Sequence, residues 1–111
     1  MQTTRLNKLL TFLTTQPDDP FILYALATEY NNLNEVEKAF FYYLKLVSEH
    51  QDYVGTYYHL GKLYEREGQP GKAIEIYQQG MARARERRNM HALSELQGAY
   101  NAAAGLDYED D

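Results

Sequence analysis

The sequence contains no cysteine, no tryptophan and only three prolines in 111 residues. Without cysteine the chain cannot form a disulfide scaffold, a thiol nucleophile, or a cysteine-ligated zinc or iron–sulfur site. No apolar run approaches the roughly 20 residues that a membrane span requires, and the amino terminus lacks the apolar core of a signal peptide. The length suits one domain. We therefore expect a soluble, cytoplasmic protein with a single domain and no membrane partner.

Basic residues are also in the minority, with 11 Lys and Arg against 16 Asp and Glu, so the formal net charge at pH 7 is -5. Nucleic-acid binding favours a basic surface that neutralises phosphates, and we therefore expect no nucleic-acid partner. Tyrosine, in contrast, is abundant, with 11 copies. Apolar residues recur at intervals of three and four over six short segments, and no segment alternates with period two. The pattern predicts an all-α protein of about six helices.

The central part of the chain repeats itself at a spacing of 34 residues, without a gap. Ala27 and Gly61 occupy the place where the two helices of a pair must approach closely, and we expect Ala39 and Ala73 to face them. The other coincident pairs are Tyr24 with Tyr58, Leu26 with Leu60, Tyr30 with Tyr64, Lys38 with Lys72, and Tyr43 with Tyr77. A fixed period of this length indicates a helical repeat, in which neighbouring copies stack to bury a shared core.

These residues resemble the tetratricopeptide repeat, whose pattern is an aromatic residue, then Leu-Gly, Tyr, Ala, an aromatic residue four positions on, and a closing Pro. The second copy follows this pattern with Tyr57, Leu60, Gly61, Tyr64, Ala73 and Tyr77. The first copy follows it with Leu23, Leu26, Ala27, Tyr30, Ala39 and Tyr43, with Leu in place of the opening aromatic residue and Ala in place of Gly. The resemblance implies a right-handed α-α superhelix (a TPR solenoid) of antiparallel helices.

The resemblance also implies a layout for the chain. We expect one domain over residues 1–106, with a half-repeat or cap helix at 3–16, repeats at 20–53 and 54–89, a capping helix at 90–104, and an acidic, disordered tail at 107–111. The family pattern is broken at three further places: Gln51 and Arg85 stand where closing prolines would be, and Gly80 replaces the usual late Ala. Without a proline near Arg85, the helix that begins at Gly71 can continue to about Arg88.

The sequence holds no enzyme motif. Gly68, Gly71 and Gly80 lack the spacing of a phosphate-binding loop, and the hydroxyl groups have no evident base and orienting acid within reach. The histidines are dispersed, and His91 with Glu95, four residues apart, is more typical of a surface pair than of metal ligands. We expect no catalytic activity, no cofactor and no metal site.

The resemblance implies a protein-interaction module, because the first helices of successive tetratricopeptide repeats line a concave groove in which an extended or helical peptide lies. Tyrosine suits such a groove, since it supplies a large contact area with little loss of rotamer freedom. The partner would be a protein or peptide. The groove-facing residues would be Phe21, Tyr24, Thr28, Asn31, Tyr58, His59, Lys62, Arg66, His91 and Glu95.

Two pairs among these residues have an alternative interpretation. Tyr24 and Tyr58 could pack between helices instead of facing a ligand, and the sequence supports the two interpretations equally. Lys62 and Arg66 lie one helical turn apart and could bind a carboxylate. They could equally pair with the glutamates beside them in the sequence, which the charge pattern slightly favours.

The run 40–43 holds more aromatic side chains than one helix face can bury. We expect Phe40 and Tyr43 to point inward, whereas Phe41 falls where the family usually has a polar residue. Phe41 and Tyr42 are therefore candidates for a contact patch on the convex side, and a self-assembling homodimer is the alternative function. An isolated exposed Phe is equally ordinary on a protein surface.

Two charged features lie outside the groove. Arg83, Arg85, Arg87 and Arg88 cluster at the carboxyl end of a helix, where cations interact favourably with the helix macrodipole. Residues 107–111 carry four carboxylates. The opposite charges lead to the hypothesis that the tail folds back onto the arginines or binds a neighbouring molecule.

Overall fold

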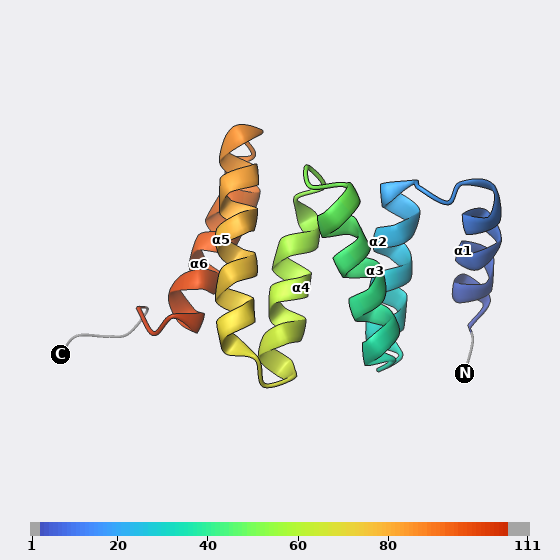
Figure 1. Cartoon of the computed structure of the whole chain (residues 1–111), viewed down its shortest axis with the longest axis horizontal. Coiled ribbons are helices and arrows are strands. Elements are labelled where there is room, and N and C mark those ends of the chain that lie inside the picture. Colours follow the sequence, from blue (N-terminus) through green and yellow to red (C-terminus); the bar gives the residue numbers. More distant parts are fainter. Residues whose placement is uncertain (1–2, 107–111) are drawn as a thin grey trace. The chain divides into compact units, whose positions relative to one another are not determined.

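The structure, a computed structural model, describes residues 3–106 (Figure 1). Its helices are α1 (Thr4–Thr15), α2 (Pro20–Asn32), α3 (Val36–Glu49), α4 (Gly55–Arg66), α5 (Pro70–Glu86) and α6 (Met90–Ala103). Six helices and no strand within residues 3–106 confirm the predicted all-α class. Over the same residues, no helix has the length and apolar character needed to cross a membrane.

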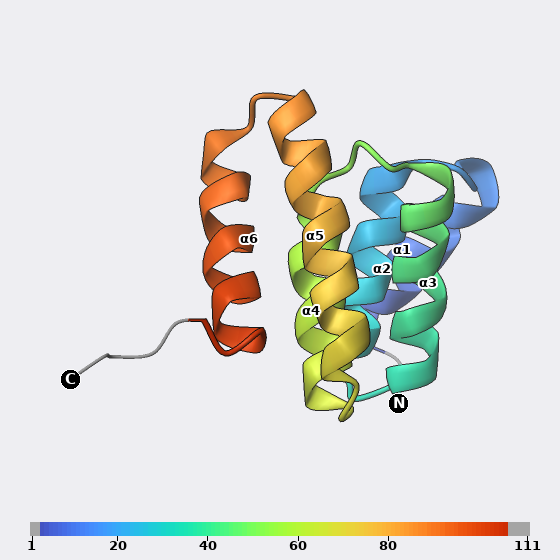
Figure 2. The ribbon, with the colours of Figure 1, turned by 60° about the vertical axis from the view of Figure 1, so that its left-hand side comes forward.

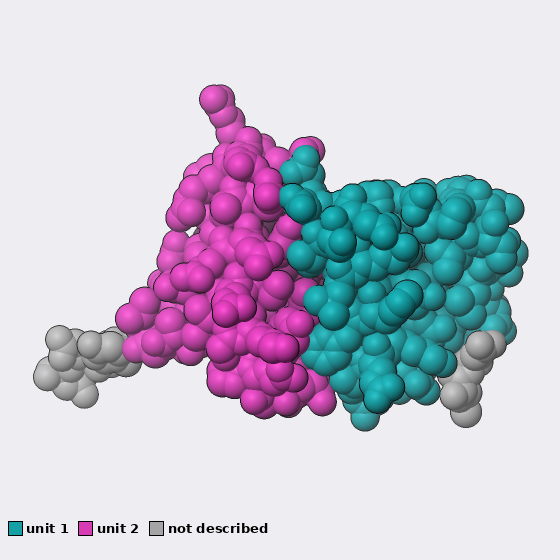
Figure 3. Space-filling model, viewed as in Figure 1, with its two compact units in different colours: residues 1–53 teal, residues 54–111 magenta. Residues whose placement is uncertain are grey.

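The chain divides into two compact units, residues 1–53 with the first three helices and residues 54–111 with the last three (Figure 3). The division falls between the two copies of the sequence repeat. The predicted layout, with one domain over residues 1–106, remains a prediction. The acidic tail predicted at 107–111 lies outside the described residues.

In unit 1, α2 packs against both α1 and α3. Leu23, Leu26 and Ala27 of α2 are fully buried, as are Tyr43 and Leu46 of α3. Full burial of a large apolar side chain stabilises the folded state by about 1.5–3 kcal/mol. This layer between α2 and α3, to which α1 adds two buried leucines, is therefore the main source of stability in unit 1.

Side-chain caps fix where α1 and α2 begin. The Thr3 hydroxyl accepts a hydrogen bond from the Leu6 N–H at 2.9 Å, and the Asp19 carboxylate accepts one from the Phe21 N–H at 2.9 Å. These caps satisfy amide groups that have no carbonyl partner in the first turn of a helix. Pro20 stands at the start of α2, where its fixed φ and missing N–H favour helix initiation.

In unit 2, α5 packs against both α4 and α6, and α4 also contacts α6. Figure 2 shows α5 and α6 side by side and antiparallel. The core is formed by Tyr57, Leu60 and Leu63 of α4, Tyr77 of α5 and Leu96 of α6, each at most 1% exposed. The observed span of α5 lies within two residues of the predicted one at each end.

The turns within the two helical hairpins, α2–α3 and α4–α5, are built alike. Asn34 and Gly68 occupy equivalent places and have positive φ angles of 64° and 79°. The next residue in each turn donates its N–H to the carbonyl of the residue five positions earlier, at 2.9 and 2.8 Å. This helix ending requires left-handed backbone, which Gly and Asn adopt at low cost.

Two buried glycines determine how closely the helices of unit 2 approach. A Cβ added at Gly61 would lie 2.1 Å from Cε1 of Tyr77, and one added at Gly80 would lie 2.5 Å from Cβ of Tyr57. The close approach predicted at Gly61 is confirmed, although its nearest neighbour is the Tyr77 ring and not Ala73. Gly80, which the sequence shows only as a departure from the family pattern, is a second contact point between α5 and α4.

Candidate functional site

Residues of α4 and α6 line a hollow on the surface of unit 2, here named the α4–α6 hollow, with a volume of about 320 Å³. The α6 residues come together because positions three and four apart share one helix face, and this face is made mainly of small side chains. The residues that line the hollow are Tyr58, Lys62, Ser94, Glu95, Gly98, Ala99 and Ala102.

The α4 side of this hollow combines a ring with a cation. The Lys62 ammonium lies 5.6 Å from the centre of the Tyr58 ring, and the same ring meets His59 edge-on at 5.5 Å. Lys62 also lies 3.9 Å from a carboxylate oxygen of Glu65, and about half of its side chain remains exposed. The ammonium is therefore held in place by neighbours and is still accessible to a ligand.

The α6 side of the hollow is acidic. The Glu95 carboxylate pairs with the His91 ring at 3.4 Å, and His91 is 85% exposed, so the two form a surface pair. Burial lowers the pKa of His59, and the Glu95 carboxylate opposes that shift. His59 is therefore kept neutral at pH 7, and the hollow presents one cation, Lys62, and one carboxylate on its opposite walls.

Arg66, also predicted to face the groove, is not among the residues that line the α4–α6 hollow. Its guanidinium lies 3.6 Å from a carboxylate oxygen of Glu67. Both predicted cations, Lys62 and Arg66, thus have a glutamate neighbour, which is the alternative that the sequence slightly favoured.

In unit 1, two predicted groove residues gather around one tyrosine of α3. Tyr24 is half-buried, meets the Tyr43 ring edge-on at 6.4 Å and lies 5.5 Å from the Tyr53 ring. The hydroxyl groups of Thr28 and Tyr43 are 3.2 Å apart and share a hydrogen bond. Asn31 is half-buried near the end of α2. The Tyr24 ring therefore packs against other rings of unit 1.

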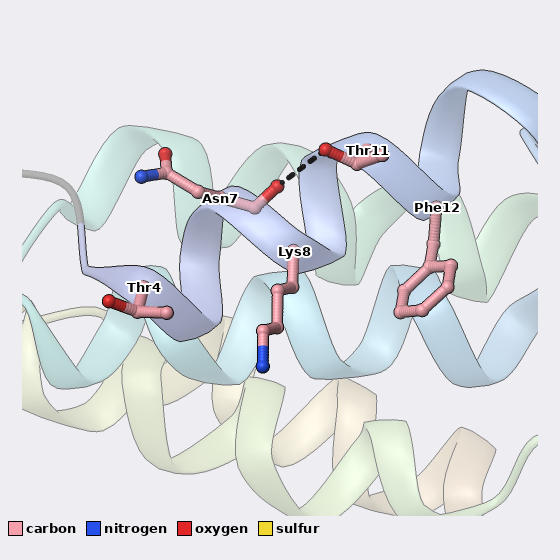
Figure 4. A pocket seen from close by; sticks show the side chains of 5 residues that line it. All are labelled: Thr4, Asn7, Lys8, Thr11 and Phe12. Carbon is pink, nitrogen blue, oxygen red and sulfur yellow. Dashed lines mark hydrogen bonds between the residues drawn. The ribbon is translucent and has the colours of Figure 1, made fainter.

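Phe21 lies in a different place from Tyr24. It borders a hollow of about 400 Å³ between α1 and α2, together with Arg5, Lys8 and Phe12. Phe12 and Phe21 are 50% and 60% exposed. Figure 4 shows Lys8 and Phe12 projecting from the same side of α1, where they also line an adjoining surface hollow. Sequence reasoning missed this α1–α2 hollow, because it treated α1 only as a cap.

The candidate self-association residues lie on α3. Phe41 is 62% exposed and meets the Tyr42 ring edge-on at 5.0 Å. The Tyr42 ring in turn stacks on Tyr30 at 5.8 Å, with the planes 5° apart, and burial raises the pKa of its hydroxyl. Phe41 is thus supported from one side by an ordered ring, while its outer face is open.

No three His, Asp or Glu side chains within residues 3–106 come together as a possible metal site.

Two helical hairpins with one spacing, one type of turn and matching tyrosines define an all-α helical-repeat protein. The chain belongs to the tetratricopeptide repeat family, which matches residues 22–51 and 54–87. This confirms the resemblance seen in the sequence. Proteins of this family generally mediate protein–protein interactions and are generally non-catalytic.

Solved structures agree with this assignment. A crystal structure of a tetratricopeptide repeat domain protein from Salinibacter ruber is 48% identical, with a TM-score of 0.76 over 81% of this chain and 100% of that one. A solution structure of a tetratricopeptide repeat domain protein from the same organism is 46% identical, with a TM-score of 0.77 over 86% of this chain and 96% of that one. A Bordetella parapertussis protein, 21% identical, has a TM-score of 0.79 over 96% and 92% and supports the fold alone. A comparison with curated proteins found no match.

Proposed function

We propose that the protein is a non-catalytic interaction module that binds a peptide segment of a partner protein, with the α4–α6 hollow as the main contact site. The observation that carries this proposal is the composition of the hollow, in which an aromatic ring, a cation and a carboxylate surround a surface of small residues. Family membership supports protein binding in general, and the hollow supplies the specific surface.

Each part of the hollow suits peptide chemistry. Gly98, where an added Cβ would meet no atom of another helix within 4 Å, and its alanine neighbours leave room for a peptide backbone to approach α6. Tyr58 supplies contact area at low entropic cost. Lys62 and Glu95 have opposite charges, so a peptide that carries an acidic and a basic side chain in the matching order can engage both.

The α2 face of unit 1 is a second, weaker contact surface in this proposal. Tyr58 lines the α4–α6 hollow, whereas Tyr24 and Thr28 contact Tyr43 within unit 1, so a ligand gains less from them than from Tyr58. We expect Tyr24→Ala to weaken binding less than Tyr58→Ala does.

A displayed library of random peptides, selected on the full chain, tests this proposal. For a selected peptide we expect Tyr58→Ala and Lys62→Ala each to raise Kd by about tenfold, the usual scale of a well-placed interface residue. Phe12→Ala removes an exposed ring of unit 1 and serves as the matched control, with Kd unchanged. Equal Kd values for all variants, or no selected peptide at all, would contradict the assignment of this site.

The alternative function is a homodimer formed through Phe41 and Tyr42, which the 62% exposure of Phe41 favours. An apolar contact of this kind is insensitive to salt. Sedimentation of wild type and Phe41→Ser over a range of concentrations tests it. A salt-independent dimer that Phe41→Ser dissociates would support this alternative, and a wild type that stays monomeric would exclude it.

A further inference from the structure

The end of α5 and the turn that follows it carry a dense positive charge. Arg83 and Arg85 lie in the last turn of α5, and Arg87 and Arg88 follow in the turn to α6. The only acid from residue 83 to 89 is Glu86, which pairs with Arg83 at 3.0 Å. Four arginines and one glutamate give this arginine turn, residues 83–89, a net charge of +3.

The arginine turn is open to an anion. Arg85, Arg87 and Arg88 are exposed. α6, a helix of 14 residues, begins at Met90, so its positive amino-terminal end lies beside the turn and offsets the negative carboxyl-terminal end of α5. Guanidinium groups bind carboxylates in a bidentate fashion, and the turn is therefore suited to an acidic peptide.

The chain itself contains an acidic peptide of matching charge. Residues 107–111 read Asp-Tyr-Glu-Asp-Asp, which gives four negative charges in a chain whose net charge is -5. No other five-residue stretch of the sequence holds four acids.

The arginine turn of the same copy is a poor target for this segment. The turn precedes α6, whereas Leu106 follows it, so the two lie at opposite ends of that helix (Figure 2). The 14 residues of α6 span about 21 Å. Five residues span at most about 18 Å even when fully extended. Only the last carboxylates of the segment can therefore approach the arginine side chains of their own copy, whereas all four can reach the arginine turn of a second copy.

We propose that residues 107–111 of one copy bind the arginine turn of a second copy. Each copy then offers one acidic segment and one arginine turn, so two copies can exchange the contact reciprocally, or successive copies can associate head-to-tail. The contact is between exposed charges and is sensitive to salt. The α1–α2 hollow is the less favourable target, because one of its two cations, Arg5, already pairs with Glu29 at 3.3 Å.

A charge exchange on the full chain tests the proposal. In low salt we expect wild type to associate with increasing concentration in sedimentation experiments, and added salt to dissociate it. The variants Arg85→Glu with Arg88→Glu, and Asp110→Lys with Asp111→Lys, should each raise the Kd of association by roughly tenfold or more. Mixing the two variants should restore association, because each then presents the charge that the other has lost.

Three controls separate a loss of this contact from a change in net charge and from a loss of folding. Lys45→Glu with Lys72→Glu makes the same change in net charge elsewhere and should leave association unchanged. Circular dichroism shows whether each variant is folded. If the arginine variant does not fold, a synthetic peptide of residues 104–111 replaces it, and an excess of that peptide should dissociate the wild type.

Three outcomes would overturn the proposal. The wild type remains monomeric in low salt at every concentration, the mixed variants fail to associate, or Lys8→Glu abolishes association while the arginine variant retains it. The last result would place the acidic segment in the α1–α2 hollow. Dissociation by Phe41→Ser alone would instead indicate the aromatic homodimer.

Discussion

The α2–α3 and α4–α5 hairpins share a period and a turn, but they place their central tyrosines differently. In unit 1 the Tyr43 hydroxyl shares a hydrogen bond with Thr28, the residue after Ala27. In unit 2 the Tyr77 hydroxyl donates to Glu65, four residues after Gly61. The Tyr77 ring lies across Gly61, where a Cβ would collide with it. The residue at this repeat position, Ala27 in unit 1 and Gly61 in unit 2, therefore correlates with the direction in which the facing tyrosine ring points.

A second pair of equivalent positions differs in the same manner. Unit 2 has Tyr57 and Gly80, whose backbones approach so closely that a second Cβ has no space. Unit 1 has Leu23 and Leu46 in the corresponding places, both fully buried. Because both leucines carry a Cβ, α2 and α3 cannot approach at this level as closely as α4 and α5 do. The two units thus pack their cores differently while following one repeat pattern. Protein cores tolerate such exchanges when the total side-chain volume is conserved.

Other features are common to both hairpins. Lys38 lies over the Tyr30 ring at 5.4 Å, and Lys72 lies over the Tyr64 ring at 5.9 Å. The repeat therefore preserves the turn and this cation–aromatic pair, and varies the packing of small against large residues.

The largest effect is expected at the closest contact. Gly80→Ala places a Cβ against the Cβ of Tyr57, which cannot move without the α4 backbone. We expect a loss of about 3 kcal/mol in the free energy of unfolding, at the upper end for overpacked cores, measured by urea denaturation. Tyr57→Leu should not rescue the variant, because leucine keeps the Cβ. A neutral Gly80→Ala, or a rescue by Tyr57→Leu, would show that the approach is not as close as described.

A smaller loss is expected at Gly61, because the group that must move is a ring and not backbone. Gly61→Ala gains about 1 kcal/mol of helix propensity but displaces the buried Tyr77 ring. We expect a net loss of about 1–2 kcal/mol. The matched change in unit 1, Ala27→Gly, should cost about 1 kcal/mol of helix propensity and about 0.8 kcal/mol more for the buried methyl group that it removes. If Gly61→Ala stabilises the protein in denaturation experiments, the proposed position of the ring is wrong.

The two tyrosine hydroxyl groups allow a more direct comparison. Tyr77 donates to a carboxylate and Tyr43 bonds to a neutral hydroxyl, and hydrogen bonds to charged groups contribute about 1.5–3 kcal/mol against about 0.5–1.5 for neutral ones. Partial exposure of Glu65 reduces the contribution of the Tyr77–Glu65 hydrogen bond. We expect Tyr77→Phe to destabilise the fold by about 0.5 kcal/mol more than Tyr43→Phe. Equal losses in parallel thermal melts would remove this distinction between the units.

The smallest effect concerns pH. Burial lowers the pKa of His59 below its ordinary value of 6.5, so the unfolded chain takes up a proton before the folded chain does. The stability that depends on neutral His59 is therefore complete above pH 6.5 and decreases as the pH falls from there toward the lower folded pKa. His59→Gln should make the free energy of unfolding less dependent on pH between about pH 7 and 5. An unchanged slope, or an NMR midpoint for His59 above 6.5, would contradict this.

The sequence was sufficient to predict the structural features that recur with the repeat period. The six helices, the turn at Gly68 and the close approach at Gly61 follow from spacing and from small residues, which depend on local sequence. The role of Gly80 did not follow, because it depends on how closely the backbone at Tyr57, on another helix, approaches it. A helical period alone does not show which neighbouring helix a side chain meets.

The candidate site shows the same limit. Tyr58, Lys62 and Glu95 were predicted as groove residues, and the structure brings them into one hollow. The small residues Ala99 and Ala102, which complete that hollow, were missed, since alanine gives no chemical signal in a sequence. Phe21, predicted beside Tyr24, instead borders α1, because its direction depends on the packing of α1 and α2.

The most direct test of the account is the affinity of a selected peptide for Gly98→Leu and Gly71→Leu. Both glycines lie in open space, so a side chain at either position leaves the fold intact, but only Gly98 lines the α4–α6 hollow. If the hollow binds the peptide, titration calorimetry should give a Kd about tenfold higher or more for Gly98→Leu and an unchanged Kd for Gly71→Leu. Equal Kd values for the two variants and the wild type would contradict the account.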